Sequence, residues 1–195
     1  LMDLSHLSYL HKNSIGSSPE DSENAQMDVK RTERGVKFMR LMLDAKCPPR
    51  IAERYGFAGQ IDRWSEFEYV APSAILQWSG IIPAGEYEKG VREGGHLVRA
   101  LHAVTPETER TSHYFFATAN GYQKPGPGDQ KNAIAGIKDV FREDVHMLEQ
   151  QQLRLDNFDT DDLLDAPSDV ARVQMIRFLK QKIKEDQDLA RPAAE

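Results

Sequence analysis

The sequence has one cysteine, no long apolar run and no excess of basic residues. A single thiol, Cys47, excludes an internal disulfide and any zinc or iron–sulfur site built from cysteines of this chain alone. No segment approaches the roughly 18 apolar residues of a membrane span, and no basic segment typical of a signal peptide precedes the first apolar residues. The net charge of -6 argues against nucleic acid, which binds basic surfaces. We therefore expect a cytoplasmic protein that binds neither membranes nor nucleic acid.

Several catalytic motifs are also absent. The sequence has no Gly-x-Ser-x-Gly elbow, phosphate-binding loop, Gly-x-Gly-x-x-Gly or His-Glu-x-x-His. Serine hydrolase, nucleotide-binding and zinc peptidase chemistries are therefore disfavoured. The 195 residues suffice for one domain with a core and a ligand cavity, and no repeat or linker divides them.

Apolar periodicity and turn residues predict an α+β fold. A helical start over residues 1–12, with Tyr9 on its buried face, leads through a polar loop (13–26) into a hairpin within 27–43 that turns at 33–35. Residues 48–63 look irregular. Further strands are predicted over 67–71, 74–82, 96–104 and 112–119. Their short connections favour antiparallel pairing.

Two helices are predicted after a loop rich in glycine and proline (121–129). The first is long, from about 130 to 156, and is expected to pack across the sheet. The second runs from about 168 to 186 with Ser168 as its N-cap. Residues 1–189 are thus expected to form the folded domain and 190–195 a disordered tail.

The first residues carry a carboxylate and two imidazoles close together: Asp3, His6 and His11. Two histidines and one carboxylate that leave coordination positions open are the ligand set of non-haem Fe(II). On a straight helix His6 and His11 point roughly 140° apart, so both reach one ion only if the helix ends, tightens or bulges. The alternative is two ordinary core or surface histidines.

The long helix offers the missing carboxylate. Its expected core face is an apolar stripe at 3, 4 and 7 spacing, formed by Ile137, Val140, Phe141 and Leu148. Asp144 falls inside this stripe, where a carboxylate costs several kcal/mol unless it is paired or bound to metal. Asp144 is therefore either the third metal ligand or the partner of a sheet arginine. Glu143 and Glu149 lie on the flanks and are given no role.

Two further histidines, His96 and His102, are six residues apart in a predicted strand and so point to the same face. If that face lines a cavity, His102 could bond a polar group of a substrate. A core histidine bonded to the backbone is the alternative.

These segments together resemble the catalytic domain of Rieske non-haem iron oxygenases, in the branch of vanillate and dicamba O-demethylases. The segments that carry the resemblance are 1–11 (LMDLSHLSYLH), 59–64 (GQIDRW), 102–109 (HAVTPETE), 112–117 (SHYFFA), 142–144 (RED) and 149–152 (EQQQ). They cover most of the chain in order, and the Asp-x-x-His-x-x-x-x-His motif with a downstream Glu-Asp is specific.

The resemblance implies a helix-grip (START-like) fold, a curved antiparallel sheet around a long C-terminal helix. It assigns His6, His11 and Asp144 as ligands of a mononuclear Fe(II), and Asp3 as the residue that relays electrons through a hydrogen bond to a ligand histidine. His102 matches a substrate-contacting position. Ala135 stands where the dicamba enzyme has a substrate-binding tryptophan, which suggests a different pocket.

The resemblance also implies a [2Fe-2S] Rieske cluster, which needs two cysteines and two histidines in paired motifs. Because Cys47 is alone, we expect the sequence to be a fragment that lacks the Rieske domain and the first part of the catalytic domain. Implied partners are O2, a small aromatic substrate, a reductase or ferredoxin, and two further subunits of a homotrimer. The expected reaction is O-demethylation or hydroxylation. Ring dihydroxylation and a noncatalytic module that binds an apolar ligand are the alternatives.

Overall fold

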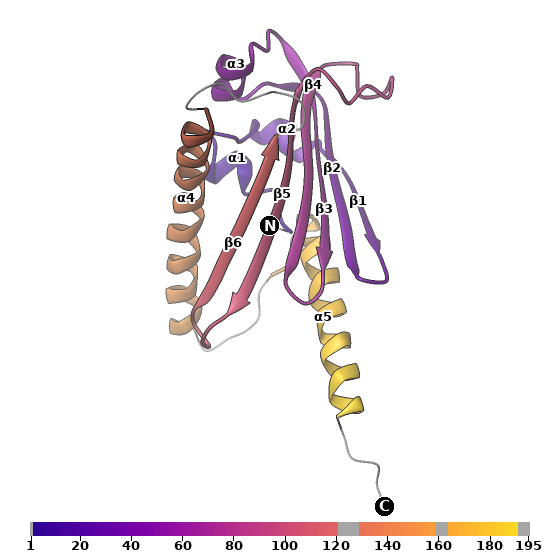
Figure 1. The fold of residues 1–195 in the computed structure, drawn as a ribbon, viewed down its shortest axis with the longest axis vertical. Coiled ribbons are helices and arrows are strands. Elements are labelled where there is room, and N and C mark those ends of the chain that lie inside the picture. The colour runs from indigo at the N-terminus through magenta and orange to yellow at the C-terminus, as the bar shows by residue number, and fades with distance from the viewer. Residues whose placement is uncertain (1, 121–128, 159–163, 191–195) are drawn as a thin grey trace, which may run out of the picture.

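The computed structural model describes residues 2–120, 129–158 and 164–190 (Figure 1). Its centre is a six-stranded sheet in which every neighbouring pair is antiparallel and the strand order follows the chain, β1 to β6. The strands are Gln26–Arg31 (β1), Gly35–Lys46 (β2), Gln60–Val70 (β3), Ala74–Pro83 (β4), His96–Pro106 (β5) and Ser112–Asn120 (β6). The predicted antiparallel sheet is confirmed.

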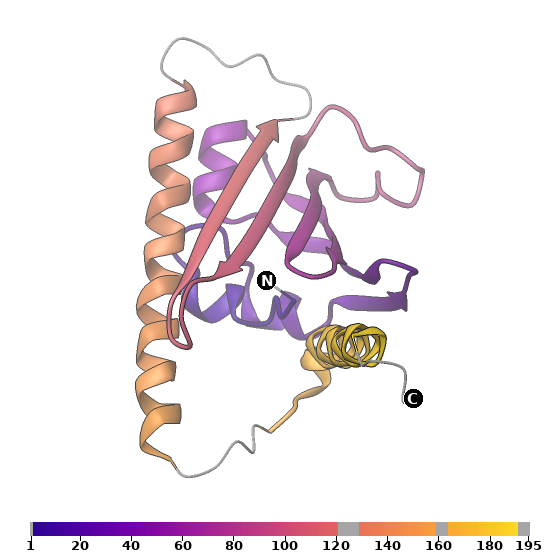
Figure 2. The ribbon, with the colours of Figure 1, turned by 60° about the horizontal axis from the view of Figure 1, so that its bottom comes forward.

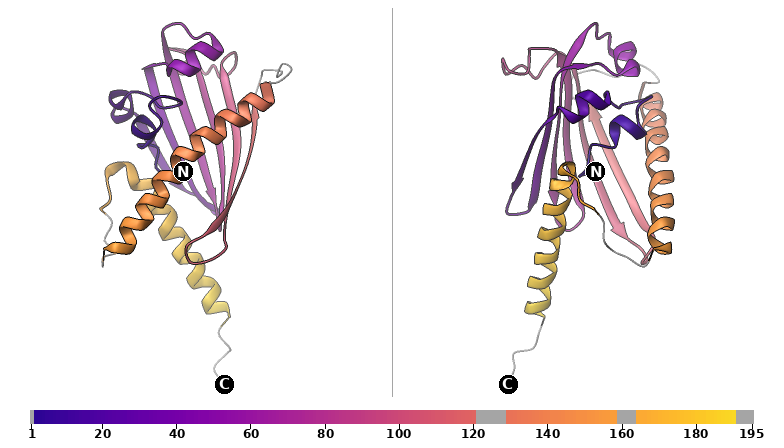
Figure 3. Two further views of the ribbon diagram at one scale, coloured as in Figure 1. Left: turned by 90° about the vertical axis from the view of Figure 1, so that its left-hand side faces the viewer. Right: turned by 180° about the vertical axis from the view of Figure 1, so that it is seen from behind.

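The helices lie at the ends and on one face of this sheet. They are Leu7–Leu10 (α1), Pro19–Glu23 (α2), Pro49–Tyr55 (α3), Asp129–Asn157 (α4) and Val170–Leu189 (α5), with a 3-10 turn (η1) at Pro167–Asp169. Figure 3 shows α4 running diagonally across the face that also carries α1 and α2. The α+β, helix-grip architecture is therefore confirmed.

The second long helix, α5, packs beneath the first two strands, where Figure 2 shows it end-on. Ala171 and Phe178 of α5 are buried against Phe38 of β2, and the same core cluster takes in Met2 and Leu4 from the start of the chain. Burying these side chains removes apolar surface from water, which is the main favourable term in folding. The core therefore fixes the point from which the His6–His11 segment departs.

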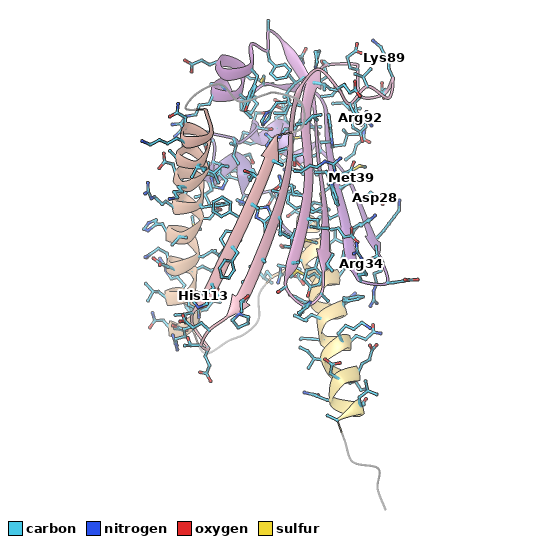
Figure 4. The ribbon with its side chains drawn as sticks, in the orientation of Figure 1. Asp28, Arg34, Met39, Lys89, Arg92 and His113 are labelled. Carbon is cyan, nitrogen blue, oxygen red and sulfur yellow. The ribbon has the colours of Figure 1, made fainter. Side chains whose placement is uncertain are left out.

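The opposite face of the sheet is covered in part by the connection between β4 and β5. The guanidinium carbon of Arg92 lies 3.5 Å from the centroid of the Tyr87 ring and 5.3 Å from that of Trp64. The Tyr87 hydroxyl contacts the sulfur of Met39, and Figure 4 labels Met39 and Arg92 on this outer face. The β4–β5 connection thus covers Trp64 on the outer face, which is the face opposite α1, α2 and α4.

Several local predictions were wrong, and proline explains two of them. Residues 13–26 contain α2, and residues 48–63 contain α3 and the start of β3. Each helix has a proline in its first turn, a favourable place because the missing N–H needs no partner there. α1 is much shorter than predicted, and Tyr9 is 62% exposed.

The N-cap of α5 is Asp169, since Ser168 lies within the preceding 3-10 turn. The loop 121–128 and the tail 191–195 lie outside the described residues. No helix in the described ranges is long and apolar enough to cross a membrane.

Candidate metal centre

The two N-terminal histidines flank the very short helix α1. His6 is its N-cap and His11 its C-cap, and the His11 N–H bonds to the carbonyl of Leu7. Because the helix ends at His11, the two rings come together, with centroids 5.4 Å apart and planes at 72°. The two imidazoles can therefore reach one ion because α1 ends at His11, which is one of the three irregularities that the sequence spacing required.

Asp144 reaches the same place from α4. Its Oδ1 lies 3.1 Å from Nε2 of His11 and 3.7 Å from Nε2 of His6. One potential ligand atom from each of the three residues lies within 4.8 Å of the others. No arginine pairs with Asp144 among the described residues, so the ion-pair alternative is not what the structure has.

The geometry of these three groups and the lowered pKa of His6 fit a bound divalent cation. Two donors about 2 Å from one ion lie about 3 to 4 Å apart, as the distances to Asp144 do. Burial lowers the pKa of His6, which favours the neutral imidazole that binds metals. If Nδ1 of His11 carries the ring proton, its Nε2 lone pair faces the Asp144 carboxylate. Two acceptors at 3.1 Å repel unless a proton or a cation lies between them.

Glu143 contributes to the centre, contrary to the sequence interpretation, which gave it no role. Its Oε2 lies 2.6 Å from Nδ1 of His11, a ring that is 1% exposed. Consecutive carboxylates of α4 thus contact both nitrogens of one imidazole. The sequence signal for Glu143 was its place beside a predicted ligand, but a flanking glutamate on an amphipathic helix usually faces solvent.

Two buried arginines hold the histidine segment against the sheet, and sequence reasoning missed both. Nη1 of Arg40 on β2 donates to the carbonyl of Leu4 at 2.8 Å, ahead of His6. Nη1 of Arg63 on β3 donates to the carbonyl of Ile15 at 2.7 Å and to Oγ of Ser17 at 3.0 Å, beyond His11. Burial, reinforced by the neighbouring Arg40 cation, lowers the pKa of Arg63 to about 10. The segment is therefore anchored on both sides of its histidines.

Gly16 allows the chain to fold back onto α1. A Cβ at this position would lie 2.1 Å from the carbonyl oxygen of Leu7 and 2.9 Å from that of His11. Backbone atoms cannot move aside as a flexible side chain can. The absence of a side chain at residue 16 thus permits the close return that brings Ile15 within reach of Arg63.

Asp3, the predicted electron relay, lies beside the centre without bonding to it. Its Oδ1 accepts a hydrogen bond from the N–H of Ser5 at 2.8 Å, and no hydrogen bond joins it to either histidine within the described residues. Asp3 lines a small cavity of about 30 Å³ with Arg40, Ser22 and other residues. A volume of this size holds about one water molecule.

His102 lies on the inner face of β5 and is 4% exposed. Its Nδ1 is 2.6 Å from the Tyr114 hydroxyl and its Nε2 is 2.9 Å from Oε1 of Gln77. Burial lowers the pKa of His102 to about 4 and raises that of Tyr114 to about 12. The neutral imidazole thus accepts from Tyr114 and donates to Gln77. A substrate contact, which stays a prediction, would have to displace one of these partners.

An aromatic cluster joins His102 to α4. The Phe141 ring meets those of His102, Tyr114 and Phe116 edge to face, at centroid distances of 6.4, 5.3 and 4.8 Å. Phe141 lies three residues before Asp144, so it belongs to the same side of the helix.

The predicted core stripe of α4 holds only in part. Ile137, Val140 and Phe141 are half-buried, but Leu148 is 60% exposed. Ala135 is exposed on the first half of α4, and its role in binding a substrate stays a prediction.

Curated relatives match most or nearly all of the chain. It is 30% identical over 198 residues to the vanillate O-demethylase oxygenase subunit of Pseudomonas sp. strain HR199, covering 97% of the chain and 55% of that protein. It is 27% identical to a toluene-4-sulfonate monooxygenase system iron-sulfur subunit (putative) of Comamonas testosteroni, covering 78% and 45%. The chain thus spans about half the length of the curated relatives it matches.

The fold also matches a solved structure. Dicamba monooxygenase bound to 3,6-dichlorosalicylic acid superposes with a TM-score of 0.75 at 20% identity, over 97% of this chain and 55% of that one. The family model described as "Vanillate O-demethylase oxygenase C-terminal domain" matches residues 1–185. The chain therefore belongs to the family of vanillate O-demethylase oxygenase C-terminal domains, as the predicted resemblance to Rieske oxygenase catalytic domains required.

Proposed function

We propose that residues 1–189 are the catalytic domain of the oxygenase component of a Rieske-type monooxygenase. The proposed reaction is O-demethylation or hydroxylation of an aromatic substrate with O2. The observation that carries this proposal is the convergence of His6, His11 and Asp144, two imidazoles and a carboxylate from segments 133 residues apart. Fe(II) held by this set, with coordination positions left open, supplies the activation of O2.

The chain's own residues would bind the metal, exclude water and orient the substrate. The lowered pKa of His6 keeps its imidazole ready to bind metal at neutral pH. Phe141 and the aromatic rings around it form an apolar wall one turn before Asp144 on α4. His102, held neutral between Gln77 and Tyr114, would bond a polar group of the substrate when the substrate displaces one of these two partners.

Electrons and subunits complete the proposal. Cys47 is the sole cysteine, so a Rieske cluster would be bound outside residues 1–195. We place it in a neighbouring subunit of a homotrimer, reduced in turn by a reductase or ferredoxin in the cytoplasm. Asp3, whose Oδ1 accepts from the N–H of Ser5, would pass the electron through a hydrogen bond to a ligand histidine that the described part of the chain does not form here.

Metal stoichiometry tests the site. We expect about one Fe(II) per chain after anaerobic loading of the wild type, and none in Asp144→Ala when circular dichroism shows that this variant is folded. Glu149→Ala, on the exposed side of the same helix, is the control and should bind like the wild type. A folded wild-type chain without iron would refute the site and favour a noncatalytic ligand-binding module.

The product identifies the reaction. With hydrogen peroxide replacing O2 and the reductase, the iron-loaded chain should convert a methoxybenzoate such as vanillate to a phenol with release of formaldehyde. A cis-diol product would instead assign ring dihydroxylation. Apo protein and Asp144→Ala with the same peroxide measure the background.

A further inference from the structure

The contact between His11 and Glu143 has no part in the proposed ligand set, yet it lies at the most buried point of the centre. The His11 side chain is 1% exposed, whereas those of His6 and Asp144 are 33% and 31% exposed. Water therefore has little access to His11. Whatever bonds to its Nδ1 must come from the protein, and Glu143 is the group that does, at 2.6 Å.

The position of this contact decides which nitrogen can bind a metal. A neutral imidazole carries one proton on Nδ1 or Nε2, and the nitrogen without it holds the lone pair. A carboxylate can only accept, and Glu143 lies 2.6 Å from Nδ1 whereas Asp144 lies 3.1 Å from Nε2, so the closer contact favours the proton on Nδ1. The lone pair is then on Nε2, which lies 3.1 Å from Asp144. The reverse tautomer would point an N–H at Asp144 and fill the place of the metal.

We propose that Glu143 is a positioning residue that fixes the Nδ1–H tautomer and the ring orientation of His11, so that Nε2 is presented to the metal. This inference rests on the proposed iron site and adds a residue to it. Carboxylates that accept from the distal nitrogen of a metal-bound histidine raise its basicity, and their loss typically weakens metal binding about 10- to 100-fold.

Glu143 and Asp144 are adjacent on α4, which explains how one helix contacts both ring nitrogens of His11. Glu143 and Asp144 are about 100° apart around the axis, so their side chains reach the two edges of a single ring that lies against the helix. Glu143 is 41% exposed and Asp144 31%. Each carboxylate side chain thus stays partly exposed to water while one of its oxygens contacts the buried imidazole.

Metal affinity and the state of the ring are measured together on the 195-residue chain. Co(II) is titrated at fixed pH and followed by visible absorption, and the ring nitrogens of His11 are observed by ¹H–¹⁵N correlation spectra of the Zn(II)-bound chain. The variants are Glu143→Leu, which removes the acceptor, and Glu143→Gln, which keeps a neutral one. Glu149→Leu on the exposed side of α4 is the matched control.

We expect Glu143→Leu to weaken Co(II) binding about 10- to 100-fold and to lose the exchange-protected Nδ1–H signal of His11. Glu143→Gln should bind within a few-fold of the wild type, with the Nδ1–H signal retained but shifted. Glu149→Leu should change neither quantity. A folded Glu143→Leu that binds Co(II) within twofold of the wild type and keeps the protected signal would overturn the inference.

Failure of the iron site itself is distinguishable. If the wild type binds no metal, the proposed function fails, and the tautomer is then determined on the apo chain, where Glu143→Leu should move the proton from Nδ1. An unchanged proton position there would overturn the inference as well. If Glu143→Leu does not fold, Glu143→Gln decides, because replacing a charged acceptor with a neutral one must shift the Nδ1–H resonance if that bond exists.

Discussion

Replacing Arg63 with methionine should weaken metal binding about 30-fold, while the free energy of unfolding falls by only about 0 to 3 kcal/mol. Arg63 lies on the inner face of β3 and donates to the carbonyl of Ile15 and the hydroxyl of Ser17. Methionine keeps much of the apolar length of the side chain but removes both donors. Residues 12–17 then lose their anchor to the sheet, although they carry no ligand themselves.

The effect on folding is the difference between two larger quantities. Two hydrogen bonds from a charged donor contribute about 1.5 to 3 kcal/mol each, so their loss costs about 3 to 6 kcal/mol. The lowered pKa of Arg63, about 10 against an ordinary 12.5, shows that its environment disfavours the cation by about 3 kcal/mol. Removing the charge recovers this amount. The free energy of unfolding should therefore fall by only about 0 to 3 kcal/mol.

The weakening of metal binding by Arg63→Met is not offset by removing the buried charge. If Ile15 and Ser17 lose their fixed conformation in the apo variant, binding must order them again, at about 1 to 2 kcal/mol per residue. A total of about 2 kcal/mol or more corresponds to roughly 30-fold weaker binding.

Urea unfolding and Co(II) titration of the same preparations measure the two effects. Arg99→Met, which removes an exposed arginine from the outer face of β5, is the control and should alter neither. The reasoning is refuted if folded Arg63→Met binds Co(II) as tightly as the wild type. Equal weakening by Arg99→Met would refute it too.

Two further predictions concern Gly16 and His102. Gly16→Ala should reduce Co(II) binding at least tenfold and lower the midpoint of urea unfolding, because its Cβ would overlap the carbonyl of Leu7; wild-type affinity in this variant would contradict the close return. His102, with a folded pKa of about 4 against 6.5, binds fewer protons folded than unfolded. The contribution of His102 to the free energy of unfolding should be constant above about pH 7. As the pH falls toward 4, protonation of His102 in the unfolded chain should lower the free energy of unfolding by at most about 3 kcal/mol. Unfolding of wild type and His102→Gln across this range should therefore diverge in that direction, and parallel curves would disprove the buried neutral state.

Much of the sheet could be predicted because strand patterns are local. The hairpin of β1 and β2 was predicted from alternation around a turn at residues 33–35, and β4, β5 and β6 from similar segments. The first half of β3 was missed for a physical reason: two of its inward positions hold polar residues, Arg63 and Ser65. A strand that buries polar side chains for the site has no clear apolar period.

The three candidate metal ligands could likewise be predicted from the sequence, because Asp144 interrupts an apolar stripe and the two histidines lie near one another in the chain. Glu143 was not, because nothing in its own neighbourhood distinguishes a glutamate that faces His11 from one that faces water. Leu148 illustrates the same gap, because periodicity places it on the inner side of α4 but the structure leaves it 60% exposed.

The sequence by itself therefore determined the α+β class, the order of the strands and the chemistry of the donor groups, all of which depend on residues close together in the chain. The tertiary structure decided that His11 and Asp144 meet across 133 residues and that Glu143 faces His11. It also decided that Arg40 and Arg63 anchor the chain on either side of the two histidines. These outcomes depend on where α4 crosses the sheet, and that crossing is set by packing between distant segments, which no local pattern encodes.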